Sequence, residues 1–499
     1  MPDRRLLAAV DLGSNSFRLL IGRVERHELG DQIMPIDSLK ESVRLAAGLG
    51  KDGLLDDDSQ QRAFGALQRF GERLRTFSPD AVRAVATNTL RVARNAKEVL
   101  GKAEKALGFP IQVIAGQEEA RLIYVGAAHA LPVDGLNRLI VDIGGGSTEC
   151  IVGRDYDASL LESANVGCVS LSQQFFPEGQ VNAENFAHAL YTARAILAPI
   201  ALKYRQHGWS CAFGTSGTAK ALTQAVQASF STEVLTREHL SRFTEMLVKA
   251  GHVDRVRIEG LKPERRPVLA GGLAALCAVF DELGVESIRY CNGALRQGVL
   301  YDLLGRSAGA DMREITVSKL MVRYGVDQRH AAVLAETACA LFAQMARVSS
   351  EEIERRSQLL TWSARLAEIG MTISHEDFHK HSAYILQNSD MPGFARDEQA
   401  QMACLALGQT GGLRKLRSLV GEPIEWLMIL CLRLASILHR RRDHEETQLP
   451  QLLIKRNRLQ ISVSRSWADA HALSDESLGT EAQTWGELGI FEEVVYQKD

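Results

Sequence analysis

The sequence lacks several features that would place it in a class at once. Its 499 residues carry 58 Lys+Arg against 61 Asp+Glu, so no general positive charge is available to bind nucleic acid. Its eight cysteines form no C-x-x-C pair, which argues against a zinc site or a disulfide framework and favours a reduced compartment. No apolar run is long enough to cross a bilayer, and Asp11 interrupts the first run before a signal-peptide core forms. We therefore expect a cytoplasmic protein with no nucleic acid partner and no stable membrane insertion.

The composition, with 45% apolar and 24% charged residues, is that of an ordinary globular protein. A chain of this length is too long for one hydrophobic core and should divide into several domains. In the N-terminal part, short β-rich runs alternate with helical runs, and this alternation predicts α/β architecture. The predicted strands are residues 6–11, 17–24, 82–86, 111–114 and 139–142, and a helix is predicted from about Asp56.

Two segments of the N-terminal part repeat each other without a gap. When Asp11 is aligned with Asp142, further identities follow: Gly13 with Gly144, Ser16 with Ser147, Gly22 with Gly153 and Arg23 with Arg154. Each copy consists of a strand, a Gly/Ser turn carrying the Asp, and a second strand. A repeat this far apart indicates duplication of a whole α/β domain. Two such domains facing each other would enclose a cleft that bears both turns.

Four glycine-rich turns offer places where phosphate can bind. The turns at 13–16 and 144–148 each follow an Asp, and their small residues let backbone N–H groups approach an anion closely. A third turn, 214–218, leads into a helical run, and a fourth, 292–298, contains Arg296. No P-loop motif is present, and each turn alone could be a simple hairpin or βα loop. Together they indicate a ligand with several phosphates.

Acidic residues flank these turns. Asp11, Asp142 and Glu149 stand beside the first two, and carboxylates next to a phosphate site are expected ligands for Mg²⁺. Glu118 and Glu119 open another helical run. Acidic residues at such a position usually complement the helix dipole, but one of them could instead be a general base that activates a water. The spacing does not choose between the two.

The second half of the chain has a different character. Residues 317–346, 351–368 and 399–407 are predicted to be helical, and a polar stretch with His and Pro at 375–393 interrupts them. A helix at 424–441, a hairpin at 452–464 and an acidic tail complete the chain. Basic groups such as Arg265 and Arg266 are expected on a solvated face, or along the path of a polyanionic substrate.

An ordered set of motifs runs through nearly the whole chain. They are VDLGSNSFR at 10–18, ATNTLR at 86–91, GQEEAR at 116–121, VDIGGGSTE at 141–149, GCVS at 167–170, GTSGT at 214–218, GALR at 293–296 and HSAYILQNSD at 381–390. This set closely resembles the exopolyphosphatase and guanosine pentaphosphate phosphohydrolase family, which is part of the actin-like ATPase and sugar-kinase superfamily. The triple glycine before Ser147 and the 381–390 segment look more like the exopolyphosphatase branch.

The resemblance implies a fold with two duplicated ribonuclease-H-like domains, at 1–125 and 126–306. A helical domain resembling the HD hydrolases would follow at 307–420, and a small mixed α/β domain at 421–499. The HD-like domain is not expected to be a second hydrolytic centre, because Ala367 and Glu368 stand where a working site would have His and Asp. The resemblance also suggests a homodimer.

The resemblance further implies an activity and roles for individual residues. The main expectation is an exopolyphosphatase that uses Mg²⁺ to release terminal phosphate from inorganic polyphosphate. Whether a monovalent cation such as K⁺ is a second cofactor is left open. Hydrolysis of pppGpp, alone or as a second activity, is the nearest alternative; a kinase of the same superfold and a polyphosphate or nucleotide sensor are more distant ones. Glu119 would activate the water and Glu149 would be the second catalytic carboxylate; Asp11, Asp142 and Glu149 would bind metal. The expected phosphate-binding residues are Ser14, Asn15, Arg91, Gly144, Gly145, Gly146, Ser147, Thr148, Gly214 and Ser216.

Overall fold

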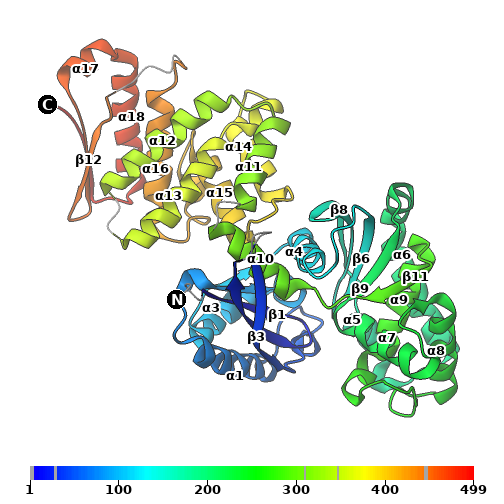
Figure 1. The fold of residues 1–499 in the computed structure, drawn as a ribbon. Coiled ribbons are helices and arrows are strands. Elements are labelled where there is room, and N and C mark those ends of the chain that lie inside the picture. Colours follow the sequence, from blue (N-terminus) through cyan, green and yellow to red (C-terminus); the bar gives the residue numbers. More distant parts are fainter. Residues whose placement is uncertain (1–4, 27–30, 308–310, 346–347, 443–447) are drawn as a thin grey trace. The chain divides into compact units, whose positions relative to one another are not determined.

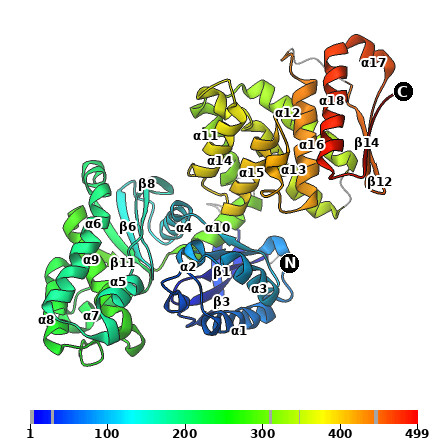
Figure 2. The same cartoon turned by 180° about the vertical axis from the view of Figure 1, so that it is seen from behind.

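The computed structural model describes residues 5–26, 31–307, 311–345, 348–442 and 448–499 (Figures 1 and 2). The chain divides into two compact units, Met1–Asp311 and Met312–Asp499. All eight cysteines lie in the described part and are free thiols. No helix in the described ranges has the length and apolar character needed to cross a membrane.

The first sheet of the N-terminal unit has the strand order β3-β2-β1-β4-β5. Its first three strands form an antiparallel meander, and β4 and β5 then run parallel to β1. The strands are β1 Leu6–Leu12, β2 Phe17–Glu25, β3 Gln32–Glu41, β4 Val82–Ala86 and β5 Ile111–Val113. The strands expected near residues 6, 17, 82 and 111 are therefore confirmed.

The second sheet repeats this topology. Its order is β10-β11-β9-β6-β7-β8: β6, β7 and β8 form an antiparallel meander, and β9 and β11 continue parallel to β6. The strands are β6 Asn137–Ile143, β7 Thr148–Arg154, β8 Asp157–Ala164, β9 Cys211–Thr215, β10 Leu235–Thr236 and β11 Ser287–Tyr290. The shared topology around the aligned Asp11 and Asp142 confirms the domain duplication that the repeat predicts and the ribonuclease-H-like fold that the resemblance implies.

Helices cover both faces of the sheets (Figure 1). Their bounds are α1 Asp57–Leu74, α2 Asn88–Val92, α3 Ala96–Leu107, α4 Gly116–Ala128, α5 Cys168–Phe175, α6 Ala183–His207, α7 Ser216–Phe230, α8 Arg237–Ala250, α9 Leu269–Leu283 and α10 Leu295–Ser307. The start of α1 shows why the sequence folds this way locally. The Asp56 carboxylate accepts a hydrogen bond of 2.7 Å from the backbone N–H of Ser59 and so caps the helix. Leu67 and Phe70, four and seven residues after Ala63, then face the core under β1.

The helices α4 and α10 cross each other between the two sheets. Although α4 follows the first sheet in sequence, it packs against β7 and β8, while α10 returns from the second sheet and packs against β1. The crossing is close because a Cβ on Gly298 would lie 1.7 Å from the carbonyl oxygen of Leu122. Gly298, which the sequence suggests as part of a phosphate-binding turn, therefore serves helix packing instead.

The C-terminal unit is helical and carries a small sheet. Its helices are α11 Met312–Arg323, α12 Gln328–Met345, α13 Ser350–Arg365, α14 Phe378–Asn388, α15 Arg396–Gly408, α16 Pro423–Leu438, α17 Arg465–Ala470 and α18 Ala472–Leu488. The sheet has the order β12-β13-β14, with β12 Gln451–Lys455, β13 Arg458–Val463 and β14 Glu493–Lys498. The predicted hairpin is confirmed, and β14 pairs with it in parallel.

Three details differ from the sequence-based expectation. The polar stretch at 375–393 contains the helix α14, and the acidic tail contains α18 and β14. The run at 317–346 is two helices, with Gly325 in the left-handed region between them, and residue 346 lies outside the described residues.

One continuous apolar cluster joins α12, α16, β13 and α18. The domain borders at 125/126, 306/307 and 420/421 stay predictions.

Candidate active site

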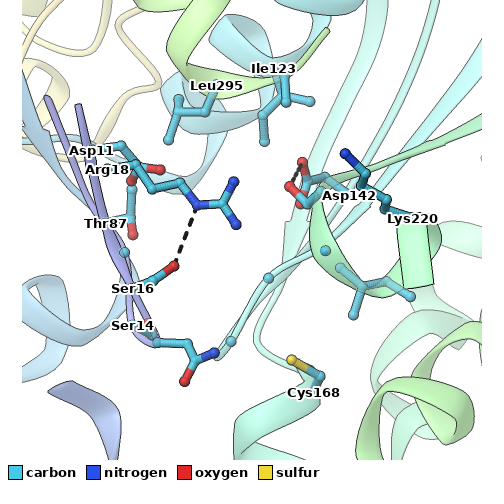
Figure 3. Close-up of a pocket in the computed structure, with 18 of the residues that line it drawn as sticks. Asp11, Ser14, Ser16, Arg18, Thr87, Ile123, Asp142, Cys168, Lys220 and Leu295 are labelled. Atoms are coloured by element: carbon cyan, nitrogen blue, oxygen red, sulfur yellow. Dashed lines mark hydrogen bonds between the residues drawn. The ribbon is translucent and has the colours of Figure 1, made fainter. Parts of the chain in front are cut away.

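The two turns of the duplicated halves face one cavity of about 320 Å³ in the N-terminal unit (Figure 3). The turns touch, because a Cβ on Gly145 would lie 2.8 Å from the Cβ of Ser14. The Ser14 hydroxyl is held by a 2.8 Å hydrogen bond from the Thr89 hydroxyl. The lining includes ten of the residues named from the sequence: Asp11, Ser14, Asn15, Glu119, Asp142, Gly144, Gly145, Gly146, Ser147 and Ser216.

Four of the named residues do not line the cavity. Arg91 and Glu149 are neighbours of Glu119 and are described with it below; the other two are Thr148 and Gly214. Thr148 is fully buried, and its hydroxyl donates a 2.6 Å hydrogen bond to the carbonyl of Val166. Gly214 sits within strand β9, where a Cβ would lie 2.6 Å from the Cβ of Ala219. The structure therefore places both in the supporting scaffold, because neighbouring strands and helices cover them.

The two aspartates at the strand ends differ in burial and in their partners, since Asp142 is buried and Asp11 is half-buried. Asp142 Oδ2 accepts hydrogen bonds from the hydroxyls of Thr215, at 2.6 Å, and Ser216, at 2.5 Å. Burial raises the pKa of Asp142, although these hydroxyls oppose the shift. Burial also raises the pKa of Asp11 to about 6, against the pull of the cations Arg18 and Arg296.

The structure decides between the two glutamates of α4. Glu118 points away from the cavity and accepts hydrogen bonds of 2.7 and 2.8 Å from Arg121. Arg121 and Arg83 both pair with Asp302 of α10, so Glu118 belongs to a buried ion cluster that ties α4 to β4 and α10. Glu119 faces the other way and lines the cavity.

Glu119 and Glu149 form a buried acidic pair next to the turns. Arg91 Nη1 lies 3.2 Å from Glu119 Oε2. Burial raises the pKa of Glu119 to about 7, with Arg91 opposing the shift and the Asp11 charge adding to it. Glu149 lies behind the lining, where Ser163 donates a 2.8 Å hydrogen bond to Oε1. Burial, then the neighbouring Glu119 charge, raises the pKa of Glu149 well above its usual range.

The duplicated position of the second strand carries opposite charges in the two halves. Asp11 pairs across the sheet with Arg18, and Asp142 pairs at the equivalent register with Glu149. Arg18 reaches into the cavity from the side of Asp11, facing Asp142 and Lys220 on the other side (Figure 3). At this position one half thus contributes a cation and the other a buried carboxylate. The gapless alignment of the repeat already places Arg18 opposite Glu149, so the difference could have been found in the sequence.

Sequence reasoning missed most of the cations around the cavity. Arg265 was expected on a solvated face or along a polyanion path, and the structure places it in the cavity wall, half-buried. Burial lowers the pKa of both Arg265 and Arg296. The other cationic lining residues are Arg18, Lys40, Lys220 and Lys262. Nothing in their spacing could have grouped them, because they come from β2, β3, α7 and the segment before α9.

The carboxylates that line the cavity could bind a metal ion that takes only a few of its ligands from the protein. Within the described ranges, no three His, Cys, Asp or Glu side chains converge to hold a metal ion. The metal-binding role expected of Asp11, Asp142 and Glu149 stays a prediction. Mg²⁺ is commonly bound by one or two carboxylates together with substrate phosphate oxygens. Asp11 and Asp142, which line the cavity from strands β1 and β6, fit that pattern.

The fold and the cavity together define a class of protein: a duplicated ribonuclease-H-like chain whose two turns, acidic groups and cations surround one cavity. A model of the Ppx/GppA phosphatase family matches residues 21–307, and one of Ppx/GppA phosphatase domain III matches residues 312–482. The chain belongs to the Ppx/GppA phosphatase family.

Its relatives cover the chain almost completely. The guanosine-5'-triphosphate,3'-diphosphate pyrophosphatase of Pseudoalteromonas translucida is 35% identical over 98% of both chains. The protein of the same name from Vibrio vulnificus is 36% identical over 97% of both. Their name corresponds to hydrolysis of pppGpp, the nearest alternative expected from the sequence, rather than to the main expectation, exopolyphosphatase.

Solved structures support the fold of the N-terminal unit. The Ppx/GppA family member of Aquifex aeolicus aligns with a TM-score of 0.51 at 22% identity, covering 61% of this chain and 99% of that one. An exopolyphosphatase of Cytophaga hutchinsonii aligns with a TM-score of 0.53 at 23% identity, covering 60% and 98%. At this identity the likeness concerns the fold alone.

Proposed function

We propose that this protein hydrolyses the terminal phosphoanhydride bond of pppGpp, releasing orthophosphate and ppGpp. The observation that carries the reaction type is the cavity in which the two duplicated turns, a buried Glu119 and several cations meet. The substrate is supported by the two curated relatives, which match this chain over nearly its full length and are named for this compound.

Hydrolysis of a phosphoanhydride needs positioning and charge neutralisation more than covalent help from the protein. In the proposed mechanism, the turn residues Ser14 and Gly145 to Ser147 hold the terminal phosphates through backbone and hydroxyl donors. Arg18 and Lys220 offset their charge from opposite walls. Asp11 and Asp142 would hold Mg²⁺, which when bound neutralises charge on the phosphate oxygens.

Glu119 is the proposed general base. Its carboxylate accepts a proton from a water whose oxygen attacks the terminal phosphorus, while the bond from that phosphorus to the bridging oxygen breaks. The leaving oxygen departs on the next phosphate. Arg91, 3.2 Å from Glu119, orients the carboxylate, and Glu149 behind it is the proposed second essential carboxylate.

Inorganic polyphosphate is the second candidate substrate, because the cations along the cavity would also suit a longer polyanion. One preparation should be assayed for phosphate release from pppGpp and from long-chain polyphosphate, with Mg²⁺ present and then chelated. We expect kcat/KM for pppGpp to be at least about 10-fold higher, equal to about 1.4 kcal/mol of transition-state binding, and both activities to be lost on chelation. Release from polyphosphate alone would reverse the substrate assignment, and release from neither would reject the function.

The pH dependence of kcat/KM tests the role of Glu119. Because the base must be ionised and burial raises the pKa of Glu119 to about 7, kcat/KM should rise about tenfold between pH 6 and pH 8. In Arg91→Gln the rising limb should move to higher pH, since Arg91 opposes the rise in pKa. A limb that arises from titration of the substrate phosphate would stay in place, and that result would contradict the assignment.

A further inference from the structure

A row of four polar side chains crosses the second sheet at the level of the buried carboxylates. At one end, Thr215 of β9 lies opposite Asp142 of β6. At the other end, Ser163 of β8 lies opposite Glu149 of β7. Asp142 and Glu149 lie opposite each other in the middle of the row. Because residues directly opposite one another on neighbouring strands have their side chains on the same face of the sheet, two hydroxyls flank two carboxylates.

The hydroxyl of Ser163 is one of few polar groups that hold the Glu149 carboxylate. It donates a hydrogen bond of 2.8 Å to Oε1, and the Ser147 hydroxyl is the other polar neighbour on the same side chain. Glu149 is 1% exposed and pairs with no Lys or Arg of the described residues, whereas Glu119 has Arg91 at 3.2 Å. A buried carboxylate without a cation depends on hydrogen bonds for its placement. The orientation of Glu149 therefore depends on these two serines.

The equivalent row of the first sheet shows that the fold does not require a hydroxyl at this place. There Asp11 lies opposite Arg18, and Arg18 lies opposite Lys40. Lys40 of β3 is exposed and occupies the position in its sheet that Ser163 has in β8. Since the same topology accepts a lysine in one half of the duplicated unit, the serine of the other half is explained by the carboxylate it holds.

Ser163 also contacts the helix that carries Glu119. Gly116 is the first residue of α4, and a Cβ added to it would lie 2.7 Å from both the Cβ and the Oγ of Ser163. Glu119 follows three residues later, about one helical turn further along the same face. Ser163 therefore touches Glu149 on one side and the start of α4 on the other, so it sets the position of one catalytic carboxylate relative to the other.

We propose that Ser163 is a positioning residue for the acidic pair: its hydroxyl holds Glu149 beside Glu119, and its contact with Gly116 sets the start of α4. This inference rests on the proposed phosphohydrolase function. Ser163 does not line the cavity, so it acts on the substrate only through Glu149. Its loss should therefore slow the catalytic step and leave substrate binding unchanged, because the turns and the cations of the cavity hold the phosphates.

The first test is Ser163→Ala, which removes the hydroxyl and keeps the Cβ. The kcat for phosphate release from pppGpp should fall at least about 10-fold, because a small misplacement of a catalytic group has an effect of this order or larger. KM should be unchanged. The matched control is Ser159→Ala on the same strand, since the Ser159 hydroxyl donates its 3.0 Å hydrogen bond to the backbone carbonyl of Val152 and to no carboxylate. Equal kcat values for the two variants would overturn the proposal.

An exchange of the two touching residues separates the hydroxyl from the packing. Gly116→Ala alone places its new Cβ against Ser163, so it should lower both the stability and kcat. Adding Ser163→Gly makes room for that Cβ. The double variant should therefore be more stable in urea unfolding than Gly116→Ala, while kcat stays low because the hydroxyl is absent. Recovery of kcat together with stability would show that Ser163 only fills space, and would reject its positioning role.

A readout without turnover separates this inference from the proposed function. Crystal structures of the wild type and the variants give the position of the Glu149 carboxylate directly, and we expect it to move in Ser163→Ala and to stay in place in Ser159→Ala. If the wild type released phosphate from neither pppGpp nor polyphosphate, the proposed function would be wrong. An unmoved Glu149 in Ser163→Ala would reject the positioning role whatever the activity of the wild type.

Discussion

Replacing Glu119 by glutamine should lower kcat for phosphate release by about 100-fold or more, because a lost general base typically removes that factor. The substitution keeps the shape of the side chain but removes its capacity to take a proton. KM should change little, since the phosphates are held by the turns and the cations. The measurement is steady-state phosphate release at pH 8, where Glu119 of the wild type is ionised.

The same variant should also be more stable at pH 8 than the wild type. The pKa of Glu119 is raised in the folded state, to about 7, so its ionised form opposes folding above that pH. The effect disappears below about pH 4.5, where the carboxyl is protonated in the folded and the unfolded chain alike. A melting curve at pH 8 and at pH 4.5 tests the sign. Unchanged turnover in a well-folded Glu119→Gln protein would contradict the proposed mechanism.

Glu118→Gln is the matched control, one residue away on the same helix. Glu118 lies in the buried cluster with Arg83 and Arg121, so its loss leaves buried positive charge with one counterion fewer. Stability should fall by about 3 kcal/mol, while turnover per folded molecule should stay closer to that of the wild type. The two neighbours would then show opposite patterns, one losing activity and the other losing stability.

Replacing Gly298 by alanine should destabilise the N-terminal unit by about 3 kcal/mol, at the upper end of the usual cost of overpacking. The added Cβ would lie 1.7 Å from the Leu122 carbonyl oxygen. That oxygen is backbone, so one helix must move away from the other. Because α4 carries Glu119 and α10 carries Arg296, the displacement should also reduce phosphate release. Urea unfolding of the variant and the wild type measures the effect: the transition midpoint should fall while the slope of the unfolding free energy against urea concentration stays the same.

Gly101→Ala controls for the general effect of adding a methyl group to a helix. Gly101 lies inside α3, and a Cβ there would meet nothing within 4 Å. Stability should therefore rise by about 0.5–1 kcal/mol through the better helix propensity of alanine. If Gly298→Ala unfolded at the same urea concentration as the wild type, the close crossing of α4 and α10 would not constrain the fold.

Local patterns were sufficient wherever one segment determines its own structure. The β-rich runs around Asp11 and Asp142 form the predicted strands because their apolar residues are buried on both faces. The prediction failed for the segment at 375–393, because its structure is not determined by its own pattern. The helix α14 in this segment buries only a few residues, including His379 and Ser382. Its polar composition hides a helix that is stabilised by packing against its neighbours.

The sequence by itself determined the duplication, the two turns and the family, because these depend on residues that are adjacent or repeat without a gap. Tertiary structure alone decided which glutamate of α4 faces the cavity, since Glu118 and Glu119 differ only in the side of the helix they occupy. It also decided that Arg18, Lys40 and Arg265 meet there. Burial and charge at a site come from segments far apart in the chain, and no local pattern records where those segments converge.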